Sequence, residues 1–334
     1  MKVVVLTTSY PSQQHPVAGT FVASSVEGVR GAGVDVEVVS PATFRHFGVA
    51  YGGGIAQNLR AAPWKLALVP GFLGAFSLAA RRAARDADLV HAHWIPSAVA
   101  ARATGKPYVL QVWGTDVELG RRAPGLVRPL LRGARTVIAA SRFLADAATE
   151  LGARRVEVVP AAVDLPASVA EPDDPPHVLF AGRLSEEKGI LEFLEATAGL
   201  PRVIVGDGPL RPRVPEAVGF VPPSEIGAYY ERAAVVCVPS RREGYGMAAR
   251  EALAYGRPVV ATRVGGLGEL GPGAVLVSPR DAPALRGVVE ELLPDAARRA
   301  VLGAEARRHA VRKAAAAELL IAAYVSSLGW SAVH

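Results

Sequence analysis

The chain has 334 residues, of which 50% are hydrophobic and 20% charged, so it is long enough for two domains and is neither disordered nor fibrous in composition. Its one cysteine, Cys237, lies in an apolar run, which excludes a disulfide framework, disfavours a cysteine metal site and favours a reducing compartment. The net charge of +6 is uneven: residues 1–165 carry 18 Lys and Arg against 11 Asp and Glu, and residues 166–334 carry 19 against 20. We therefore expect the first half to meet any acidic surface or ligand.

The first half of the chain alternates short β-branched runs with segments of helix length. It opens on a strand at 2–7, whose apolar run is too short for the core of a signal peptide. A helix near 19–32 follows, and further strands are predicted at 34–40, 87–93, 107–112 and 135–140. The longest uncharged apolar stretch, 66–80, is interrupted by proline and glycine and falls short of the ~20 residues that cross a bilayer, so no membrane span is predicted.

The second half repeats this rhythm after a proline-rich stretch at 165–177, which we interpret as a linker of limited flexibility. It contains a predicted helix at 186–199 and predicted strands at 177–182, 202–206, 234–239 and 257–262. Continuous apolar strands covered by helices on both faces are typical of parallel sheets, so the sequence predicts an α/β protein with two doubly wound domains. Ligands of such sheets lie beyond the carboxyl ends of the strands, and two such domains facing each other enclose a cleft.

The turn after the strand at 234–239 is the most informative one. It reads Ser-Arg-Arg-Glu-Gly-Tyr-Gly-Met over 240–247 and leads into a helix, whose first N–H groups suit a phosphate or a polyhydroxylated ring. Glu243 precedes this helix and Glu251 lies inside it, and ionised carboxylates accept hydrogen bonds from vicinal hydroxyls of a ribose or hexose. The alternative is that Glu243 caps the helix and Glu251 is a solvated helix position.

A second turn, Gly-Arg-Leu-Ser-Glu-Glu-Lys-Gly over 182–189, follows the strand at 177–182. Ser185 is a good N-cap, but Lys188 in the first turn opposes the helix dipole, which suggests an anionic ligand. Arg183 and Lys188 could together neutralise a diphosphate, the guanidinium by paired hydrogen bonds and the ammonium as a point charge. The alternative is a surface lysine paired with the neighbouring glutamates.

These two turns, with the segment VGDGP at 205–209, resemble the carboxyl-terminal domain of family four glycosyltransferases. Segments of the first half, DLVHAHW and VIAASRFLADAATELG among them, resemble the amino-terminal domain of the same family, so the resemblance covers most of the chain. It implies the GT-B fold, two Rossmann-like domains facing each other across a cleft. It also implies domains at 1–165 and 166–318, with a terminal helix at 319–334 that returns to the first domain. The implied enzyme is a retaining hexosyltransferase that uses a UDP- or GDP-type sugar with no cofactor and no dedicated metal.

The resemblance carries roles over to individual residues of this sequence. Arg183 and Lys188 would bind the donor diphosphate, Glu243 the transferred sugar, and Glu251 the ribose of the nucleotide. Gly19, in the loop after the first strand, would close over the phosphates from the opposite domain. The remaining expected donor contacts are backbone groups of one turn and two residues beside the base: Gly244, Tyr245, Gly246, Met247, Phe220 and Val221.

One departure from the family concerns catalysis. Many relatives place a histidine after the strand at 107–112, close to the anomeric carbon, where this chain has Trp113. An indole can stack on a sugar but cannot accept a proton, which disfavours a general base at this position. A front-face mechanism, in which the leaving phosphate assists the acceptor hydroxyl, needs no such base and remains compatible with the sequence. His93 and Asp116 are nearby candidates for polar catalytic roles, whereas His91 is expected to be packed on its strand.

Three further observations on motifs carry less weight than the two turns. Asp86-Ala87-Asp88 matches a metal-binding string of other transferases but precedes a strand rather than following one, so we do not expect it to bind metal. No G-x-G-x-x-G follows the first strand, which disfavours a nicotinamide-dependent dehydrogenase. The turn before Asp164 lacks the Asn-Gly that relatives often have.

Basic residues of the first half suggest where the acceptor comes from. Five arginines and no acid lie between Arg121 and Arg135, and basic residues flank the apolar stretch 66–80, which contains Phe72 and Phe76. This pattern is typical of an interfacial element at an anionic membrane, and a buried helix with an arginine-rich solvated face is the alternative. Nucleic acid is a less favoured partner, because interleaved aromatic residues and a known binding module are missing from the sequence.

We therefore predict a cytoplasmic retaining glycosyltransferase, peripheral to the inner face of the membrane if its acceptor is lipid-linked or membrane-associated. The donor is expected on residues 166–318 and the acceptor on residues 1–165. Two other classes remain open: a nucleotide-sugar epimerase of the same architecture, which would use no acceptor, and a catalytically inert sugar-nucleotide-binding protein.

Overall fold

The computed structural model describes all residues except 17, 52–53, 311–312 and 331–334, and it divides the chain into two compact units. Unit 1 comprises Met1–Ala162 with Lys313–His334, and unit 2 comprises Val163–Arg312. The expected boundary at 165 therefore falls three residues late, and the terminal segment of unit 1 begins at 313 rather than 319.

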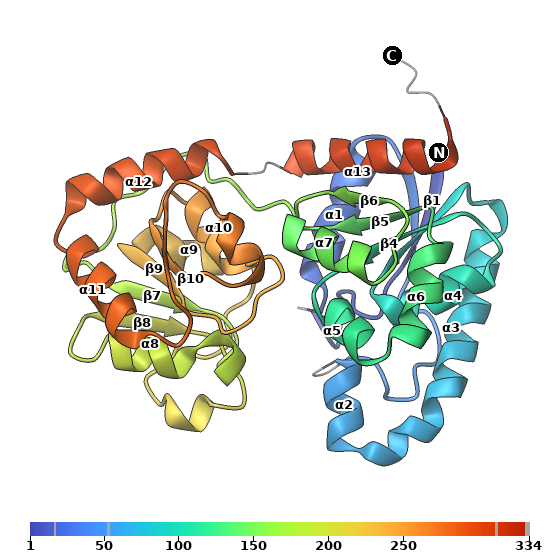
Figure 1. The fold of residues 1–334 in the computed structure, drawn as a ribbon, viewed down its shortest axis with the longest axis horizontal. Coiled ribbons are helices and arrows are strands. Elements are labelled where there is room, and N and C mark those ends of the chain that lie inside the picture. Colours follow the sequence, from blue (N-terminus) through green and yellow to red (C-terminus); the bar gives the residue numbers. More distant parts are fainter. Residues whose placement is uncertain (17, 52–53, 311–312, 331–334) are drawn as a thin grey trace. The chain divides into compact units, whose positions relative to one another are not determined.

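Unit 1 is built on a six-stranded parallel sheet of order β2-β1-β3-β4-β5-β6 (Figure 1). Its four central strands are buried along nearly their whole length because both faces of the sheet are covered by helices. Their bounds are β1 (Lys2–Leu6), β2 (Asp35–Val39), β3 (Leu89–His93), β4 (Tyr108–Val112), β5 (Thr136–Ala139) and β6 (Val156–Val158).

One face of this sheet packs on α1 (Thr20–Gly31) and α13 (Lys313–Leu328), the terminal helix. Val22, Val26 and Val29 of α1 meet Leu320 and Tyr324 of α13 in one apolar cluster, so α13 belongs to the core of unit 1. The other helices of this unit are α2 (Ile55–Ala61), α3 (Val69–Ala83), α4 (Ile95–Ala103), α5 (Thr115–Arg122), α6 (Pro124–Gly133) and α7 (Arg142–Glu150).

The apolar stretch at 66–80 lies in a longer helical segment than the sequence predicted. Two short 3-10 turns, η1 (Pro63–Leu68) and η2 (Ala84–Asp86), extend α3 to a continuous helix over Pro63–Asp86. By length and composition alone this is one helix that could cross a membrane. Its residues Phe72, Phe76 and Ala80, however, are buried in unit 1.

Unit 2 has a five-stranded parallel sheet of order β11-β10-β9-β7-β8. The strands are β7 (Val178–Ala181), β8 (Arg202–Val205), β9 (Val235–Val238), β10 (Val259–Thr262) and β11 (Ala274–Val277). One apolar cluster joins the sheet to α8 (Ile190–Ala196) and α11 (Ala282–Leu292), and another joins it to α9 (Ile226–Arg232), α10 (Met247–Ala254) and α12 (Ala296–Arg308). The single helix predicted at 186–199 is broken, because a 3-10 turn η3 (Glu186–Lys188) precedes α8.

The stretch 165–177 is tied to unit 2 rather than free. The Arg257 guanidinium donates to the Ala170 carbonyl, and the Asp173 backbone N–H donates to the Arg232 carbonyl at 2.9 Å. The Arg232 guanidinium also pairs with the Asp173 carboxylate at 2.9 Å. These bonds hold residues 170 and 173 against unit 2, to which the whole stretch belongs.

Candidate functional site

The two turns singled out in the second half lie side by side at the carboxyl ends of β7 and β9, which are neighbours in the sheet. Gly189, which follows η3, has a φ of +72°, and a Cβ placed on it would lie 1.9 Å from the Pro239 carbonyl oxygen. Only glycine fits there without strain. The Arg241 backbone N–H donates to the Glu187 carbonyl at 2.8 Å, so the turn after β7 is fixed against the turn after β9.

This contact brings Lys188 and Glu243 together. Lys188 Nζ lies 2.6 Å from Glu243 Oε2, and their side chains are 32% and 15% exposed. Ser240 Oγ lies 3.4 Å from the same carboxylate oxygen. A cation and a carboxylate separated by 55 positions in the sequence thus meet at the ligand-binding edge of the sheet.

The two neighbouring glutamates of the turn pair with arginines: Glu186 with Arg241, and Glu187 with Arg242 at 3.7 Å, while Arg241 also reaches Glu192 of α8. Arg241 Nε donates to Glu192 Oε1 at 2.7 Å, and Arg241 Nη1 donates to Glu186 Oε2 at 3.1 Å. The alternative in which Lys188 pairs with the adjacent glutamates is therefore not what the structure shows. Arg183 lies on the same turn with its side chain exposed.

Glu251 is not a solvated helix position. It lies on α10, and its Oε2 accepts a hydrogen bond from the Tyr230 hydroxyl at 2.8 Å. Burial raises the pKa of Glu251, the Tyr230 hydrogen bond opposes this rise, and Asp164 adds to it. A carboxylate held in place by a buried tyrosine is suited to receive further hydroxyl donors.

The amino terminus of α10 completes this edge of unit 2. Gly246 is its N-cap, no acidic residue lies in its first turn, and Tyr245 is buried under the Arg250 guanidinium, 4.1 Å from its ring centre. Phe220 is exposed in the loop after β8, and Val221 packs partly into the apolar cluster of α9 and α10. Met247 is the first residue of α10, and Gly244 lies in the turn that precedes this helix.

In unit 1, the predicted polar residues are buried and support the turn after β4. Trp113 Nε1 donates to His93 Nδ1 at 3.2 Å, which assigns the His93 proton to Nε2. Burial, with His91 next to it, holds the pKa of His93 well below its usual value. Asp116 accepts backbone N–H groups of Ile95 and Trp113 at 2.8 and 2.9 Å. Burial raises its pKa to about 6 although these bonds lower it.

The two candidates therefore orient Trp113 and its turn, and neither is exposed. His91 is packed as expected, with its Nδ1 2.7 Å from the Tyr324 hydroxyl and its pKa lowered by burial to about 3. Asp88, of the Asp-Ala-Asp string, accepts the Lys2 backbone N–H at 2.8 Å. Gly19 is the N-cap of α1, packed against the Ser9 carbonyl.

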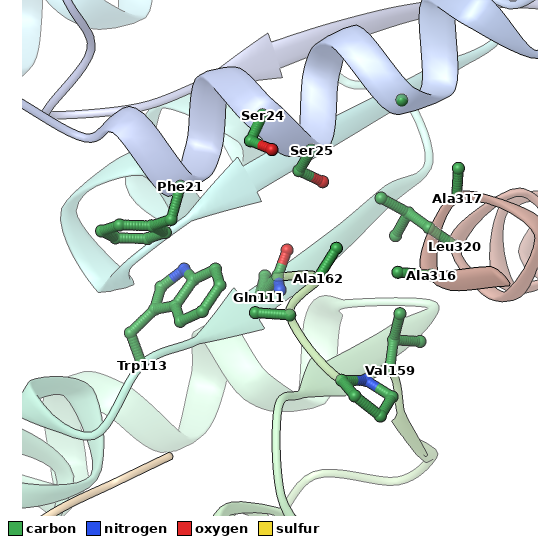
Figure 2. Close-up of a pocket in the computed structure, with 13 residues that line it drawn as sticks. Phe21, Ser24, Ser25, Gln111, Trp113, Val159, Ala162, Ala316, Ala317 and Leu320 are labelled. Carbon is green, nitrogen blue, oxygen red and sulfur yellow. The ribbon is translucent and has the colours of Figure 1, made fainter. Parts of the chain in front are cut away.

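A small pocket of about 30 Å³ beside Trp113 contains residues that the sequence reasoning missed (Figure 2). Phe21 and Trp113 lie at one end, and Ser24 and Ser25 project from α1 toward Gln111. Gln111 Oε1 is buried and has no hydrogen-bond partner among the described residues. The only sequence signal for this pocket was Gln111 itself, a polar residue in the otherwise apolar strand β4. The pocket has room for one or two water molecules that such an oxygen could bind.

Comparison with known proteins identifies the family of the chain. Residues 18–166 match the family Glycosyltransferase Family 4, and residues 175–295 match Glycosyl transferases group 1. D-inositol 3-phosphate glycosyltransferase 1 of Catenulispora acidiphila is 32% identical over 322 residues, covering 78% of this chain and 77% of that protein.

Solved structures share the fold. Sucrose-phosphate synthase of Thermosynechococcus elongatus superposes with a TM-score of 0.81 at 21% identity, covering 98% of this chain and 100% of that one. HepE of Anabaena, solved in complex with UDP-glucose, superposes with a TM-score of 0.73 at 19% identity over 98% of this chain and 100% of that one. The expected GT-B architecture is thereby confirmed, and the chain belongs to the group 1 glycosyltransferases, enzymes that transfer a sugar from a nucleotide-sugar donor.

Proposed function

We propose that this enzyme transfers a hexose from a UDP- or GDP-type sugar to an acceptor hydroxyl with retention at the anomeric carbon and without a dedicated metal ion. The observation that carries the proposal is the pair formed by Lys188 and Glu243, 2.6 Å apart at the carboxyl edge of the unit 2 sheet. An ammonium beside a carboxylate offers one group for a phosphate and one for sugar hydroxyls.

In this proposal each residue of the edge has one role. Lys188 and Arg183 neutralise the diphosphate. Their side chains supply the positive charge that a metal ion would supply in other transferases. Glu243 accepts hydrogen bonds from the transferred sugar, and Glu251, held by Tyr230, accepts them from the ribose. The first N–H groups of α10 face the phosphates, as helix amino termini commonly do.

The remaining predicted contacts keep their proposed roles. Phe220 and Val221 border the base, and Phe220 is exposed enough to do so. Gly19 of unit 1 stays a predicted phosphate contact. The relative named above that was solved with UDP-glucose supports a nucleotide sugar as the donor class.

The proposed chemical step needs no protein base. The acceptor oxygen attacks the anomeric carbon on the face from which the diphosphate leaves, and the hydroxyl proton passes to the leaving phosphate oxygen. One carbon–oxygen bond forms, one breaks, and the proton ends on the nucleoside diphosphate. Trp113 cannot take this proton, because its indole nitrogen already carries one and donates it to His93. Lys188 and Arg183 stabilise the negative charge that develops on the diphosphate.

We further propose that the protein works in the cytoplasm on a lipid-linked or membrane-associated acceptor. The excess positive charge of residues 1–165, 18 Lys and Arg against 11 Asp and Glu, supports an acceptor presented at an anionic surface.

The test has a binding part and a product part. A thermal-shift panel of UDP- and GDP-hexoses should show one donor class raising the melting temperature, because a ligand at 100 times its Kd stabilises by about 2.7 kcal/mol. With that donor, ¹H NMR of the product should show the same anomeric configuration as the donor, and a chelator should leave the rate unchanged. Inversion, or a rate that needs added metal, would refute the mechanism. Donor converted to an epimer without any acceptor would identify an epimerase instead, and tight donor binding without turnover would indicate an inert protein.

A further inference from the structure

We propose that unit 1 docks on an anionic lipid surface through the exposed side of α2, η1 and α3. This inference rests on the proposed membrane-associated acceptor and names the surface that meets the bilayer. We define the docking surface as the exposed residues of 55–85 (Figure 1).

The helix over Pro63–Asp86 is apolar but faces outward. In its most apolar 18-residue window the mean hydropathy is 1.3, and only 17% of that window is buried. Neither α2 nor η1 has a buried residue. Trp64 and Leu66 of η1 are 67% and 60% exposed, and Leu78 of α3 is 51% exposed. Large apolar side chains gathered on one exposed segment mark an interaction site, whereas single ones are ordinary.

The opposite side of the same helix is anchored in the protein. Phe72, Phe76 and Ala80 are buried, and the Phe76 ring stacks on Phe44 with ring centres 4.7 Å apart. Lys65 Nζ donates to the Gly48 carbonyl at 3.0 Å and fixes η1 to the preceding loop. A membrane span would have to pull these side chains out of unit 1, so the helix is suited to lie on a bilayer rather than to cross it.

The outward stripe of α3 changes from apolar to basic along its length. Exposed positions recur at helical spacing at Pro70, Gly74, Leu78 and Arg81 of α3, and the spacing continues to Arg85 of η2. With Arg60 and Arg82, the basic members form no ion pair and no hydrogen bond among the residues that the structure describes. A tryptophan beside basic residues is the composition that favours the headgroup region of a membrane.

The charge of this segment is of one sign. Between Glu37 and Asp86 the sequence holds six Lys and Arg and no acidic residue. An acidic protein partner would need the apolar side chains to find a complementary pocket, whereas an anionic bilayer takes both the apolar and the basic groups without one. Charge and apolarity together therefore point to phosphate-bearing lipid headgroups as the partner.

The test is co-sedimentation of the full-length protein with phosphatidylcholine vesicles, with and without phosphatidylglycerol. We expect binding to the anionic vesicles at low salt and its loss at high salt, since each basic group at the surface strengthens binding by about fivefold at low salt. A variant with Trp64→Ser and Leu66→Ser, and a variant with Arg60, Arg81, Arg82 and Arg85 changed to Gln, should each bind at least ~tenfold more weakly.

The matched charge control uses exposed arginines outside both the docking surface and the stretch from Arg121 to Arg135. Arg102, Arg154, Arg280 and Arg308 form no ion pair among the described residues, and changing all four to Gln removes the same charge. Val301→Ser, on α12, is the apolar control. Both controls should bind vesicles as the wild type does, and all variants should keep the wild-type melting temperature and the donor-induced thermal shift.

Three results would overturn the proposal. They are no binding to anionic vesicles at low salt, unchanged vesicle binding of both surface variants, or a loss of vesicle binding in the four-arginine control equal to that in the four-arginine surface variant. Vesicle binding without any donor-induced shift would refute the proposed function and leave the docking surface intact, so the two failures are distinguishable.

Discussion

Replacing Lys188 by methionine is the perturbation that most sharply separates binding of the diphosphate from binding of the nucleoside. Methionine keeps an unbranched side chain of similar length and removes only the charge and the donors. Hydrogen bonds to charged groups contribute about 1.5–3 kcal/mol. In the free enzyme Lys188 already bonds Glu243 at 2.6 Å, so part of its interaction with a phosphate replaces an existing one.

We therefore expect the lower part of that range, a rise of about 10- to 30-fold in the Kd of UDP or GDP. Isothermal titration calorimetry should show this rise for the nucleoside diphosphate and little change for the nucleoside alone, because the proposed ribose contact is made by Glu251, which Tyr230 holds in place on α10. Arg213→Met, which removes an exposed charge elsewhere on unit 2, should leave both affinities unchanged. Unaltered diphosphate affinity in Lys188→Met, or an equal loss for the nucleoside, would refute the assignment.

The same variant tests the ion pair itself. A double-mutant cycle of Lys188→Met with Glu243→Gln, followed by urea unfolding, should give a coupling energy of about 1 kcal/mol, since both side chains retain some solvent contact. A coupling energy within error of zero would show that the pair contributes nothing to the free energy of unfolding.

The other predictions concern four further positions. Glu251→Ala should weaken nucleoside affinity by about tenfold, because it removes the proposed bonds to the ribose. Tyr230→Phe should weaken it by less, because it removes only the hydrogen bond that orients the Glu251 carboxylate. An unchanged Michaelis constant for the donor in Glu251→Ala would contradict the assignment. Gly189→Ala should destabilise the chain by at least about 2 kcal/mol in urea unfolding, because its φ is +72° and the new Cβ meets the Pro239 carbonyl; a wild-type midpoint would show that the two turns are not so closely packed. Asp116 has a folded pKa of about 6 against 3.8 unfolded, so the folded state holds its proton more tightly. The free energy of unfolding should fall by up to about 3 kcal/mol between pH 4 and 7 relative to Asp116→Asn, and a difference that rises or stays flat would contradict this.

The buried strands of both sheets could be predicted because their apolar runs are continuous. Each of the nine strands predicted from such runs overlaps a strand of the structure. The edge strands β6 and β11 were missed. β6 has three residues with an acidic one in the middle, and β11 is a four-residue apolar run of which only the last residue is buried. The predicted helix at 186–199 was wrong in its first turn, where the left-handed Gly189 separates η3 from α8. That break depends on a backbone contact with Pro239, which is 50 positions away and leaves no local signal.

The site was predictable where the chemistry is carried by the turns themselves. Lys188, Glu243 and Glu251 were predicted as ligand groups. The structure brings Lys188 and Glu243 together and places Glu251 on α10, the helix that follows Glu243; the contacts of all three with the donor stay predictions. Tyr230 was missed because a tyrosine on an amphipathic helix is ordinarily core. Asp116 could be suggested from its position, but only the structure shows that both of its bonds go to backbone N–H groups.

The most direct measurement is a crystal structure of the protein with the nucleoside diphosphate that the thermal-shift panel selects. The account predicts diphosphate oxygens within hydrogen-bond distance of Lys188 Nζ and Arg183, with the ribose hydroxyls donating to Glu251. A nucleotide bound elsewhere, with Lys188 still paired only to Glu243, would contradict it.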